Sequence, residues 1–473
     1  MCVHSARPVE TLQESRLLLY TDKEAYALSE NITIIVSNIG DESVYWVGRC
    51  PVPWDIFTSP DEVCVFATVP CFCLFELLPG ENVTYIWNKA DPFTVCPIEP
   101  GMYVVRDNQG WGFSTRFMIV DADTVVPDDY PTIQEAINNA VEGNTVFVRN
   151  GTYCENVVVN KTIALTGESN ENTVVDGGGV GTVVRIDSDG VTISGFEIRN
   201  CSMEWGNWGI ALNHSSKSVI KENTVTAVYA ISIEGGSQNR IEDNDVVGHD
   251  GSCIFNGLQL VDSNDNVVSG NNLSLNCHFA LTIRNSSSNR ISSNYVSGHF
   301  VPFPFTMDKA DNNSIVGNTM WQPAPFFGGH IHFKESKGNV LYHNSFLADE
   351  GPNTMSIDEF STNNTWDNGC EGNYWSDYSG TDSNNDGVGD TPFYIDENNQ
   401  DDYPLVNPHW NPADVNHDLR VDIYDAVLIC GAYTATPSAP NWNPHCDIAE
   451  PYEIIDIYDA VLLCDNYGEE YSP

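Results

Sequence analysis

The stretch from Ser218 to Val225 reads Ser-Val-Ile-Lys-Glu-Asn-Thr-Val, and the stretch from Asn239 to Val246 reads Asn-Arg-Ile-Glu-Asp-Asn-Asp-Val. The same pattern recurs at residues 266–273, 289–296, 313–320 and 339–346. By subtraction, its inner asparagine returns after 21, 27, 23, 24 and 26 residues, at Asn223, Asn244, Asn271, Asn294, Asn318 and Asn344. Gly167 and Gly195 look like earlier members of the series.

A repeat of this length, with short β-branched segments and no helical periodicity, predicts a right-handed parallel β-helix. Each coil of such a fold hydrogen-bonds to the next coil, ~4.8 Å along the axis. Asparagines that stack at one inward corner can satisfy one another's amide groups. We therefore expect a structural amide ladder from these residues, and no catalytic role.

The repeats are bounded by two distinctive ends. Residues 129–137 contain Pro131 ahead of a short helix, and Thr132 with Glu135 resembles a capping box. Such a helix, followed by a first strand at 143–148, would cover the open apolar end of the array. The other end carries Gly-Asn-Tyr-Trp at 372–375, an acidic loop at 382–390 and Asp-Asp-Tyr-Pro-Leu at 401–405.

With these two ends, residues 122–407 resemble the NosD-like surface β-helix family, and they also fit the broader group of carbohydrate-binding and sugar-hydrolase β-helices. The resemblance implies the fold and leaves the function open, because one fold hosts many roles. Copper handling, which the family name suggests, lacks a His/Met/Cys site in this sequence. We expect this second domain to span residues 122–410.

Ahead of the repeats, residues 17–120 alternate apolar and polar side chains between turn signals such as Pro79-Gly80 and Pro100-Gly101. This pattern predicts an antiparallel sandwich of about seven strands, within a domain at residues 1–121. The segments that read as strands are 17–20, 32–36, 83–87, 102–105 and 117–120. The pattern resembles an immunoglobulin-like or BsuPI-type accessory domain.

The tail repeats itself after 34 residues: Asp-Ile-Tyr-Asp-Ala-Val-Leu at 422–428 returns at 456–462. Before and within the first copy, oxygen side chains fall at positions 1, 3, 5, 9 and 12 of a loop, and position 7 can offer a backbone carbonyl. That spacing surrounds one Ca²⁺ ion with hard oxygen ligands. The predicted ligands are Asp414, Asn416, Asp418, Arg420, Asp422 and Asp425.

Two further calcium sites are predicted. The second copy of the tail gives a distorted site, with Asp447, Glu450, Asp456 and Asp459 as candidate ligands. The loop at 382–390 offers Asp382, Asn384, Asp386, the carbonyl of Val388 and Asp390. Gly387 stands there at the position where such a loop turns sharply and needs a positive φ. The alternative for this loop is an acidic, solvated turn.

Two loop–helix units in tandem resemble a type I dockerin, over residues 411–468 of a third, small α-helical domain at 411–473. The resemblance implies calcium-dependent binding to a cohesin-like β-sandwich. The residues that it implies contact the partner are Ile423, Tyr424, Ile457 and Tyr458. The alternative is that these are core residues at the helix starts. Because the chain begins with a predicted β-sandwich, its own N-terminal domain is a second candidate partner, and copies joined head to tail would form an open filament.

The composition indicates an exported protein. A formal charge of −46, from 66 acidic and 20 basic residues, excludes nucleic acid and anionic membranes as partners. Fourteen cysteines fit a disulfide-permissive compartment, and no apolar run is long enough to span a membrane. No signal peptide is visible, and we expect a mature form without its leader. Candidate N-glycosylation sites are Asn31, Asn82, Asn150, Asn160, Asn200, Asn213, Asn272, Asn285, Asn312 and Asn363.

The loops between repeats carry aromatic residues, which suit stacking on sugar rings. The candidate glycan-binding residues are Trp205, Trp208, Trp321, Phe326 and Phe327. The alternative is that these loops fold back and cover their own side of the coil. Further on, alternation would place Ile331 and Phe333 inward and both His330 and His332 on the outer face, with Lys334.

No ordered set of catalytic carboxylates of the kind that β-helix pectinases need is found in the sequence. Our leading hypothesis is therefore an extracellular, non-catalytic assembly protein of the cell surface or matrix, with glycan binding as an added role. The rival is a polysaccharide lyase or glycosidase that its dockerin delivers to a scaffold.

Overall fold

The computed structural model describes residues 17–467 except for 51, 90–91, 110–111, 248–254, 276–278, 299–302, 323–328, 350–352, 354, 385, 409–414, 416–420, 422, 437–438, 440, 442–445 and 447–453. The side chains at 47–50, 70–73, 275 and 465–466 are not described either. The chain divides into two compact units, residues 1–174 with 191–196 and residues 175–190 with 197–473. The predicted domain boundaries at 121/122 and 410/411 stay predictions.

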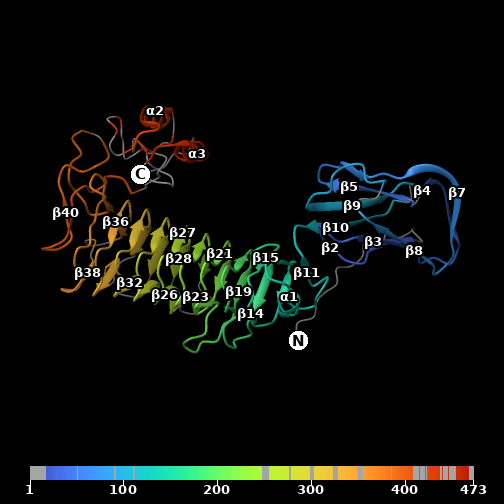
Figure 1. The fold of residues 1–473 in the computed structure, drawn as a ribbon, viewed down its shortest axis with the longest axis horizontal. Helices are drawn as coiled ribbons and strands as arrows, with labels where there is room; N and C mark the ends of the chain where they lie inside the picture. Colours follow the sequence, from blue (N-terminus) through green and yellow to red (C-terminus); the bar gives the residue numbers. More distant parts are fainter. Residues whose placement is uncertain are drawn as a thin grey trace. The chain divides into compact units, whose positions relative to one another are not determined.

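The N-terminal part of the first unit is built from short sheets, mostly antiparallel (Figure 1). The first sheet contains, in order, β1 (Leu17–Thr21), β3 (Ile32–Asn38) and β8 (Asn82–Trp87). The second contains β2 (Ala25–Ala27), β10 (Ser114–Val120), β9 (Gly101–Asp107), β5 (Trp54–Ser59) and β6 (Cys64–Phe66). The third contains β4 (Val44–Cys50) and β7 (Val69–Leu77). All five predicted strand segments are found.

One apolar core joins these sheets. Ile34 of β3 and Trp87 of β8 pack in the same buried cluster as Trp54 of β5 and Phe117 of β10. The aromatic rings meet edge to face: the ring centroids of Trp87 and Phe117 are 6.4 Å apart at an interplanar angle of 72°. The described residues form ten strands here, where about seven were predicted, because β2 and β6 are only three residues long and show no clear alternation.

The repeats form a parallel β-helix, as predicted, with one strand of each coil in each of three parallel sheets (Figure 1). The first sheet contains β11 (Thr124–Val126), β12 (Thr145–Val148), β15 (Ala164–Gly167), β18 (Thr192–Ser194), β21 (Val219–Lys221), β24 (Arg240–Glu242), β27 (Val267–Ser269), β30 (Arg290–Ser292), β33 (Ser314–Val316) and β36 (Val340–Tyr342). The second contains β13 (Gly151–Tyr153), β16 (Thr173–Asp176), β19 (Glu197–Arg199), β22 (Thr224–Thr226), β25 (Asp245–Val247), β28 (Asn272–Leu275), β31 (Tyr295–Gly298), β34 (Thr319–Gln322), β37 (Ser345–Ala348) and β39 (Tyr374–Trp375). The third contains β14 (Val157–Val159), β17 (Val184–Ile186), β20 (Ile210–Asn213), β23 (Tyr229–Glu234), β26 (Asn256–Val261), β29 (Phe279–Arg284), β32 (Phe305–Asp308), β35 (Ile331–Lys334) and β38 (Ser356–Ile357).

The predicted amide ladder is present at one corner of the coils. Each asparagine donates from its backbone N and its Nδ2 to the Oδ1 of the next; for Asn271 and Asn294 both distances are 3.0 Å. We call this series, Asn223, Asn244, Asn271, Asn294, Asn318, Asn344 and Asn373, the first ladder. It ends on Asp401, whose Oδ2 accepts from Asn373 N at 2.7 Å.

A second ladder, which we did not predict, runs along another corner. It is made by the first asparagine of each repeat, with the same paired donation from one residue to the next. Its members are Asn239, Asn266, Asn289, Asn313, Asn339 and Asn364. The residue before each of them, from Gln238 to Asn363, has a positive φ. The turn into the left-handed region therefore aims each asparagine at the next coil.

Short elements lie at the two ends of the coils. α1 (Ile133–Asn139) buries Ile133, Ala136 and Ile137, and its N-cap Thr132 accepts from Glu135 N at 3.1 Å, as predicted. Near the other end, β40 (Phe393–Tyr394) and β41 (Gln400–Asp401) form an antiparallel pair. The tail folds into α2 (Ile423–Ala432) and α3 (Ile457–Asn466), which contact each other.

Candidate functional site

The two tail helices expose the same apolar side chains. They begin at equivalent positions of the 34-residue repeat, and their burial patterns agree almost residue by residue. We call the six exposed residues the helix-pair face; their exposed fractions are 57% for Ile423, 67% for Tyr424 and 60% for Val427, against 56% for Ile457, 57% for Tyr458 and 48% for Val461. The alternative that these are core residues at the helix starts does not hold, because about half or more of each side chain is exposed.

Behind this face, the first turn of each helix carries a fully buried carboxylate, Asp425 in α2 and Asp459 in α3. In α3 the Oδ2 of Asp459 accepts from Asp456 N at 2.7 Å, and the Oδ1 of Asp456 accepts from Tyr458 N at 2.8 Å, which completes a capping box. A buried carboxylate is costly unless it is hydrogen-bonded, paired or metal-bound, so a cation placed here would stabilise both helix starts. The remaining predicted ligands of the tail lie outside the described residues: Asp414, Asn416, Asp418, Arg420, Asp422, Asp447 and Glu450.

The acidic loop at 382–390 turns as predicted, with φ +85° at Gly387. The Asp382 carboxylate bridges the turn, because it accepts from Asp386 N at 3.3 Å and from Gly387 N at 3.0 Å. The Oδ1 of Asp386 accepts from Val388 N at 3.0 Å, and Asn384 donates to its Oδ2 at 2.7 Å. Asp390 accepts instead from the Ser383 and Thr381 hydroxyls, which hold its pKa below the usual value.

Within the described parts of the chain, no group of three His, Cys, Asp or Glu side chains is close enough to share a metal ion. The loop at 382–390 therefore has the backbone turn of a calcium loop, and its carboxylates accept hydrogen bonds from the loop and from Thr381 beside it. All three calcium sites stay predictions.

The candidate glycan-binding residues are only partly brought together. Trp208 is buried and packs on Tyr229 at a ring-centroid distance of 5.4 Å, while Trp205 covers the same tyrosine at 5.3 Å and is 67% exposed. Phe255 also stacks on Tyr229, at a ring-centroid distance of 5.9 Å. Trp321 lies apart on β34, where its Nε1 donates to Asp349 at 2.9 Å. Phe326 and Phe327 lie outside the described residues.

The prediction that both histidines of this region lie on the outer face is wrong for His330. Its side chain is fully buried, with Nε2 2.7 Å from the Oδ1 of Asn353, and burial lowers its pKa to about 4. The alternation fails because β35 begins only at Ile331, so His330 still belongs to the corner. His332 is half-buried with Nδ1 3.0 Å from Ser356 Oγ, and Lys334 pairs with Asp308 at 3.3 Å.

Nine of the ten sequon asparagines are exposed, and glycosylation at them stays a prediction. Asn200 is the exception: it is half-buried, and its Nδ2 donates to both carboxylate oxygens of Asp176 at 2.9 Å. Cys154 is disulfide-bonded. No helix among the described residues is long and apolar enough to cross a membrane.

Sequence reasoning missed two buried titratable sites, which together hold three groups. Asp401 is fully buried, and burial raises its pKa to about 7 against the hydrogen bonds it accepts from Asn373 and Trp375. The second site is the buried contact between His343 and Glu371. Asp401 belongs to the Asp-Asp-Tyr-Pro-Leu segment that marked the end of the array, and that position was the available signal.

Residues 137–324 match the family model described as periplasmic copper-binding protein (NosD). The match covers 324 − 137 + 1 = 188 of 473 residues, less than half of the chain. No curated protein matches the chain.

Similar solved structures include the Dettilon tailspike protein, with 14% identity over 53% of this chain and 66% of that one at a TM-score of 0.35. The family 28 exopolygalacturonase from Yersinia enterocolitica has 10% identity over 76% and 86% of the two chains at 0.33. The alginate lyase from Paenibacillus sp. str. FPU-7 has 16% identity over 51% and 94% at 0.26. The strand pairing of this chain establishes the parallel β-helix by itself, and likenesses this distant decide no function.

Proposed function

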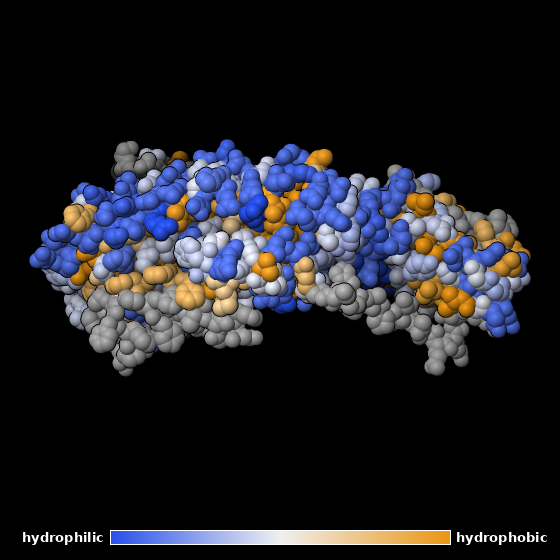
Figure 2. Space-filling model, turned by 90° about the horizontal axis from the view of Figure 1, so that it is seen from below, coloured by the Kyte–Doolittle hydropathy of each residue, from blue (hydrophilic) through white to orange (hydrophobic). Residues whose placement is uncertain are grey.

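We propose that this protein is an extracellular, non-catalytic assembly protein that attaches to a β-sandwich partner through its helix-pair face. The observation that carries the proposal is the repeated exposure of isoleucine, tyrosine and valine at equivalent positions of α2 and α3. Exposed apolar side chains that recur on both helices of a strongly acidic chain indicate a surface that a partner covers. On the side of the molecule that Figure 2 shows, hydrophilic residues dominate and hydrophobic ones form small patches.

Calcium is part of the proposal. The buried Asp425 and Asp459 stand at the first turn of the two helices that form the face. One divalent ion at each helix start, held by this carboxylate and the predicted loop oxygens of the same repeat, would fix the first turn from which the exposed tyrosine projects. Removing the ion would then loosen the face and weaken the attachment.

The test is a pull-down of the intact protein with a cohesin-type β-sandwich, with calcium and with chelator. The variant Tyr424→Ala/Tyr458→Ala removes the most exposed aromatic of each helix, and we expect it to weaken binding at least about tenfold. Tyr394→Ala is the matched control, because Tyr394 is 70% exposed but lies on β40. If neither the chelator nor the double substitution weakens binding, the proposal is wrong.

Glycan binding is the second candidate function, favoured by the aromatic cluster of Trp205, Trp208, Tyr229 and Phe255. Beside it, Asn256 is buried with an Oδ1 that has no partner among the described residues. An exposed indole suits stacking on a sugar ring, and the net charge favours a neutral sugar. A glycan array read with wild type and Trp205→Ala tests this, with Tyr394→Ala as control.

A further inference from the structure

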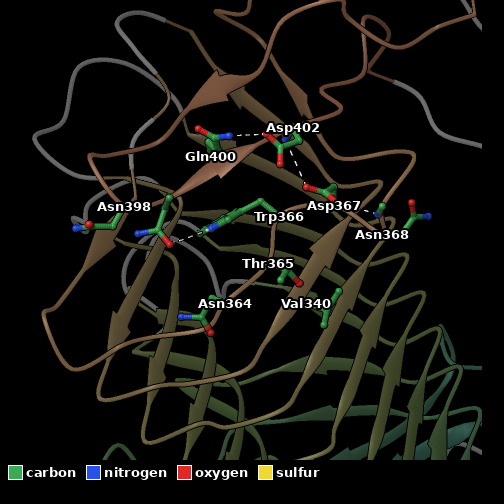
Figure 3. A pocket seen from close by; sticks show the side chains of 11 residues that line it. Val340, Asn364, Thr365, Trp366, Asp367, Asn368, Asn398, Gln400 and Asp402 are labelled. Carbon is green, nitrogen blue, oxygen red and sulfur yellow. Dashed lines mark hydrogen bonds between the residues drawn. The ribbon is translucent and has the colours of Figure 1, made fainter.

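A pocket of about 530 Å³ opens beside the last coil of the β-helix (Figure 3). Asn364, Thr365 and Asp367 line it from the coil, while Asn398, Gln400 and Asp402 line it from the segment around β41. The volume lies in the range of small-molecule sites. The pocket belongs to neither the helix-pair face nor the aromatic cluster.

The pocket lies at the end of the second ladder. Asn339 donates from its backbone N and its Nδ2 to the Oδ1 of Asn364, each at 3.0 Å. Asn364 donates one Nδ2 hydrogen back to Ser336 O at 3.1 Å. Among the described residues, no acceptor is found for its backbone N–H or for its other Nδ2 hydrogen. Every earlier asparagine of this ladder donates its backbone N–H and an Nδ2–H to the next coil. At Asn364 these two donors therefore have no acceptor among the described residues.

The first ladder shows what such an end accepts. Its last asparagine, Asn373, donates from its backbone N at 2.7 Å and from its Nδ2 at 3.4 Å to one oxygen, the Oδ2 of Asp401. A Cβ at Gly372 would lie 1.8 Å from Asp401 Oδ1, so this cap fits against bare backbone. One ladder is thus closed by an sp² oxygen of the chain itself, and the equivalent position of the other is a cavity.

We propose that this pocket binds the acetamido group of a neutral sugar, whose carbonyl oxygen takes the place of the missing next rung at Asn364. Along both ladders the acceptor is a carboxamide oxygen that receives an N–H and an Nδ2–H together, and an acetamido group presents the same oxygen. The side chains of Thr365 and Asn398 have no partners among the described residues and are available to ring hydroxyls. Val340 and the edge of Trp366 supply an apolar wall for the methyl group.

Charge decides against an anionic ligand. The carboxylates of Asp367 and Asp402 line the same pocket. Their hydrogen-bond donors are all neutral: Asp402 accepts from Gln400 Nε2 at 2.5 Å, and Asp367 accepts from Gly369 N at 2.8 Å and from Asp402 N at 3.4 Å. The structure describes no Lys or Arg on the lining. A uronate or acetate would meet two like charges, whereas a neutral amide would not.

The source of the sugar is either free saccharide or the glycan on the protein's own Asn363. The sequon Asn363-Asn364-Thr365 places a predicted N-glycan one residue from the open rung, and Asn363 is exposed. Both sources offer the same chemistry. We therefore use two preparations of the full chain, one from a host without N-glycosylation and one from a glycosylating host.

The test is a ligand-observed NMR titration of the unglycosylated protein with N-acetylglucosamine, with glucose and acetate as comparison probes. We expect saturation transfer to be strongest at the acetamido methyl. Asn364→Asp keeps the acceptor for Asn339 but removes the open Nδ2 donor, and Thr365→Tyr fills the pocket from an exposed position. Each should weaken binding about tenfold or more. Thr362→Tyr is the control, because Thr362 is exposed on the same coil and does not line the pocket.

Equal binding of glucose, tighter binding of acetate, or unchanged binding in Thr365→Tyr would each overturn the proposal, as would no binding of N-acetylglucosamine to the unglycosylated chain. In the glycosylated preparation, binding that appears only after Asn363→Gln assigns the protein's own glycan as occupant. Equal binding with and without that change assigns a free saccharide.

Discussion

At the scale of single residues, the β-helix depends on asparagines that no solvent reaches. Asn271 receives two hydrogen bonds on Oδ1 from Asn244 and donates through Nδ2 to Ile241 O, Ser269 O and Asn294 Oδ1, at 2.7 to 3.0 Å. Each buried donor left without an acceptor costs on the order of 1–3 kcal/mol. A ladder therefore makes every coil depend on the next.

The adjacent pair Asn271 and Asn272 tests this dependence. Asn271→Ala leaves the backbone N–H of Asn244 without an acceptor and removes one of the three acceptors of its Nδ2. We expect the free energy of unfolding to fall by about 3 kcal/mol. Asn272→Ala is the matched control, because Asn272 is exposed and its side chain makes two solvent-exposed hydrogen bonds, to Asp245 Oδ1 and from Ser274 N. Urea unfolding of both variants measures the difference. Equal losses would show that the ladder adds nothing beyond strand pairing.

Asp401 predicts an unusual pH dependence. Because burial raises its pKa to about 7, the folded state holds a proton between about pH 4 and pH 7 that the unfolded chain has lost. Its contribution to stability is therefore complete below pH 4 and is lost as the pH rises through 7, by up to ~4 kcal/mol. This opposes carboxylates such as Asp176, whose pKa is lowered by Asn200, Gly178 and Arg199 in spite of burial.

Asp401→Asn keeps an oxygen for Asn373 and cannot titrate. From pH 5 to pH 8 we expect the unfolding free energy of the wild type to fall relative to that of the variant. Urea unfolding at the two pH values measures it, and the other carboxylates cancel in the comparison. A difference independent of pH would contradict the raised pKa.

At the scale of elements, two coils approach each other through bare backbone at Gly167 and Gly195. A Cβ on Gly167 would lie 2.1 Å from Gly195 O, and Gly195 itself has φ +77°. Both glycines were recognised as early members of the repeat. The close approach of the two backbones explains why both positions are glycine.

Gly167→Ala should therefore destabilise the first coils, by about 2 kcal/mol or more, because backbone rather than a flexible side chain must shift. Gly431→Ala is the control, since Gly431 is helical and a Cβ there meets nothing within 4 Å. Thermal unfolding of the two variants measures the effect. A melting temperature for Gly167→Ala no lower than that of the control would show that the coils can separate without cost.

How much of these elements was predictable follows from where the signal lies. The repeat Asn-x-Ile-x-x-Asn gave the coils because β-branched strands and corner asparagines recur together. The second ladder was missed although its asparagines were in view, because no pattern tells which of two corner residues faces inward. His330 was misplaced because alternation holds only within a strand. The fate of Trp208, buried under Trp205, depends on how its loop folds back, which only tertiary packing decides.

At the scale of the whole molecule, the proposed attachment requires a surface that receives the helix-pair face. The N-terminal sheets offer one answer, because they expose apolar side chains of their own, with Tyr45, Leu74 and Ile86 exposed by 53%, 66% and 58%. If these receive the helix-pair face of another copy, the contact is heterologous, and a heterologous contact that does not close into a ring extends into a filament.

This arrangement predicts calcium-dependent polymers of the purified protein. Sedimentation with calcium should show species that grow with concentration. Chelator should return them to monomers, because the buried Asp425 and Asp459 would each lose the ion that we propose at the helix start. Ile86→Lys on β8 and Tyr424→Lys on α2 should each abolish growth, since one charge blocks either side of the contact. Mixing the two variants should restore heterodimers and nothing longer, because each retains one intact surface. Monomers at all concentrations with calcium present would rule out self-assembly and leave a separate β-sandwich protein as the partner.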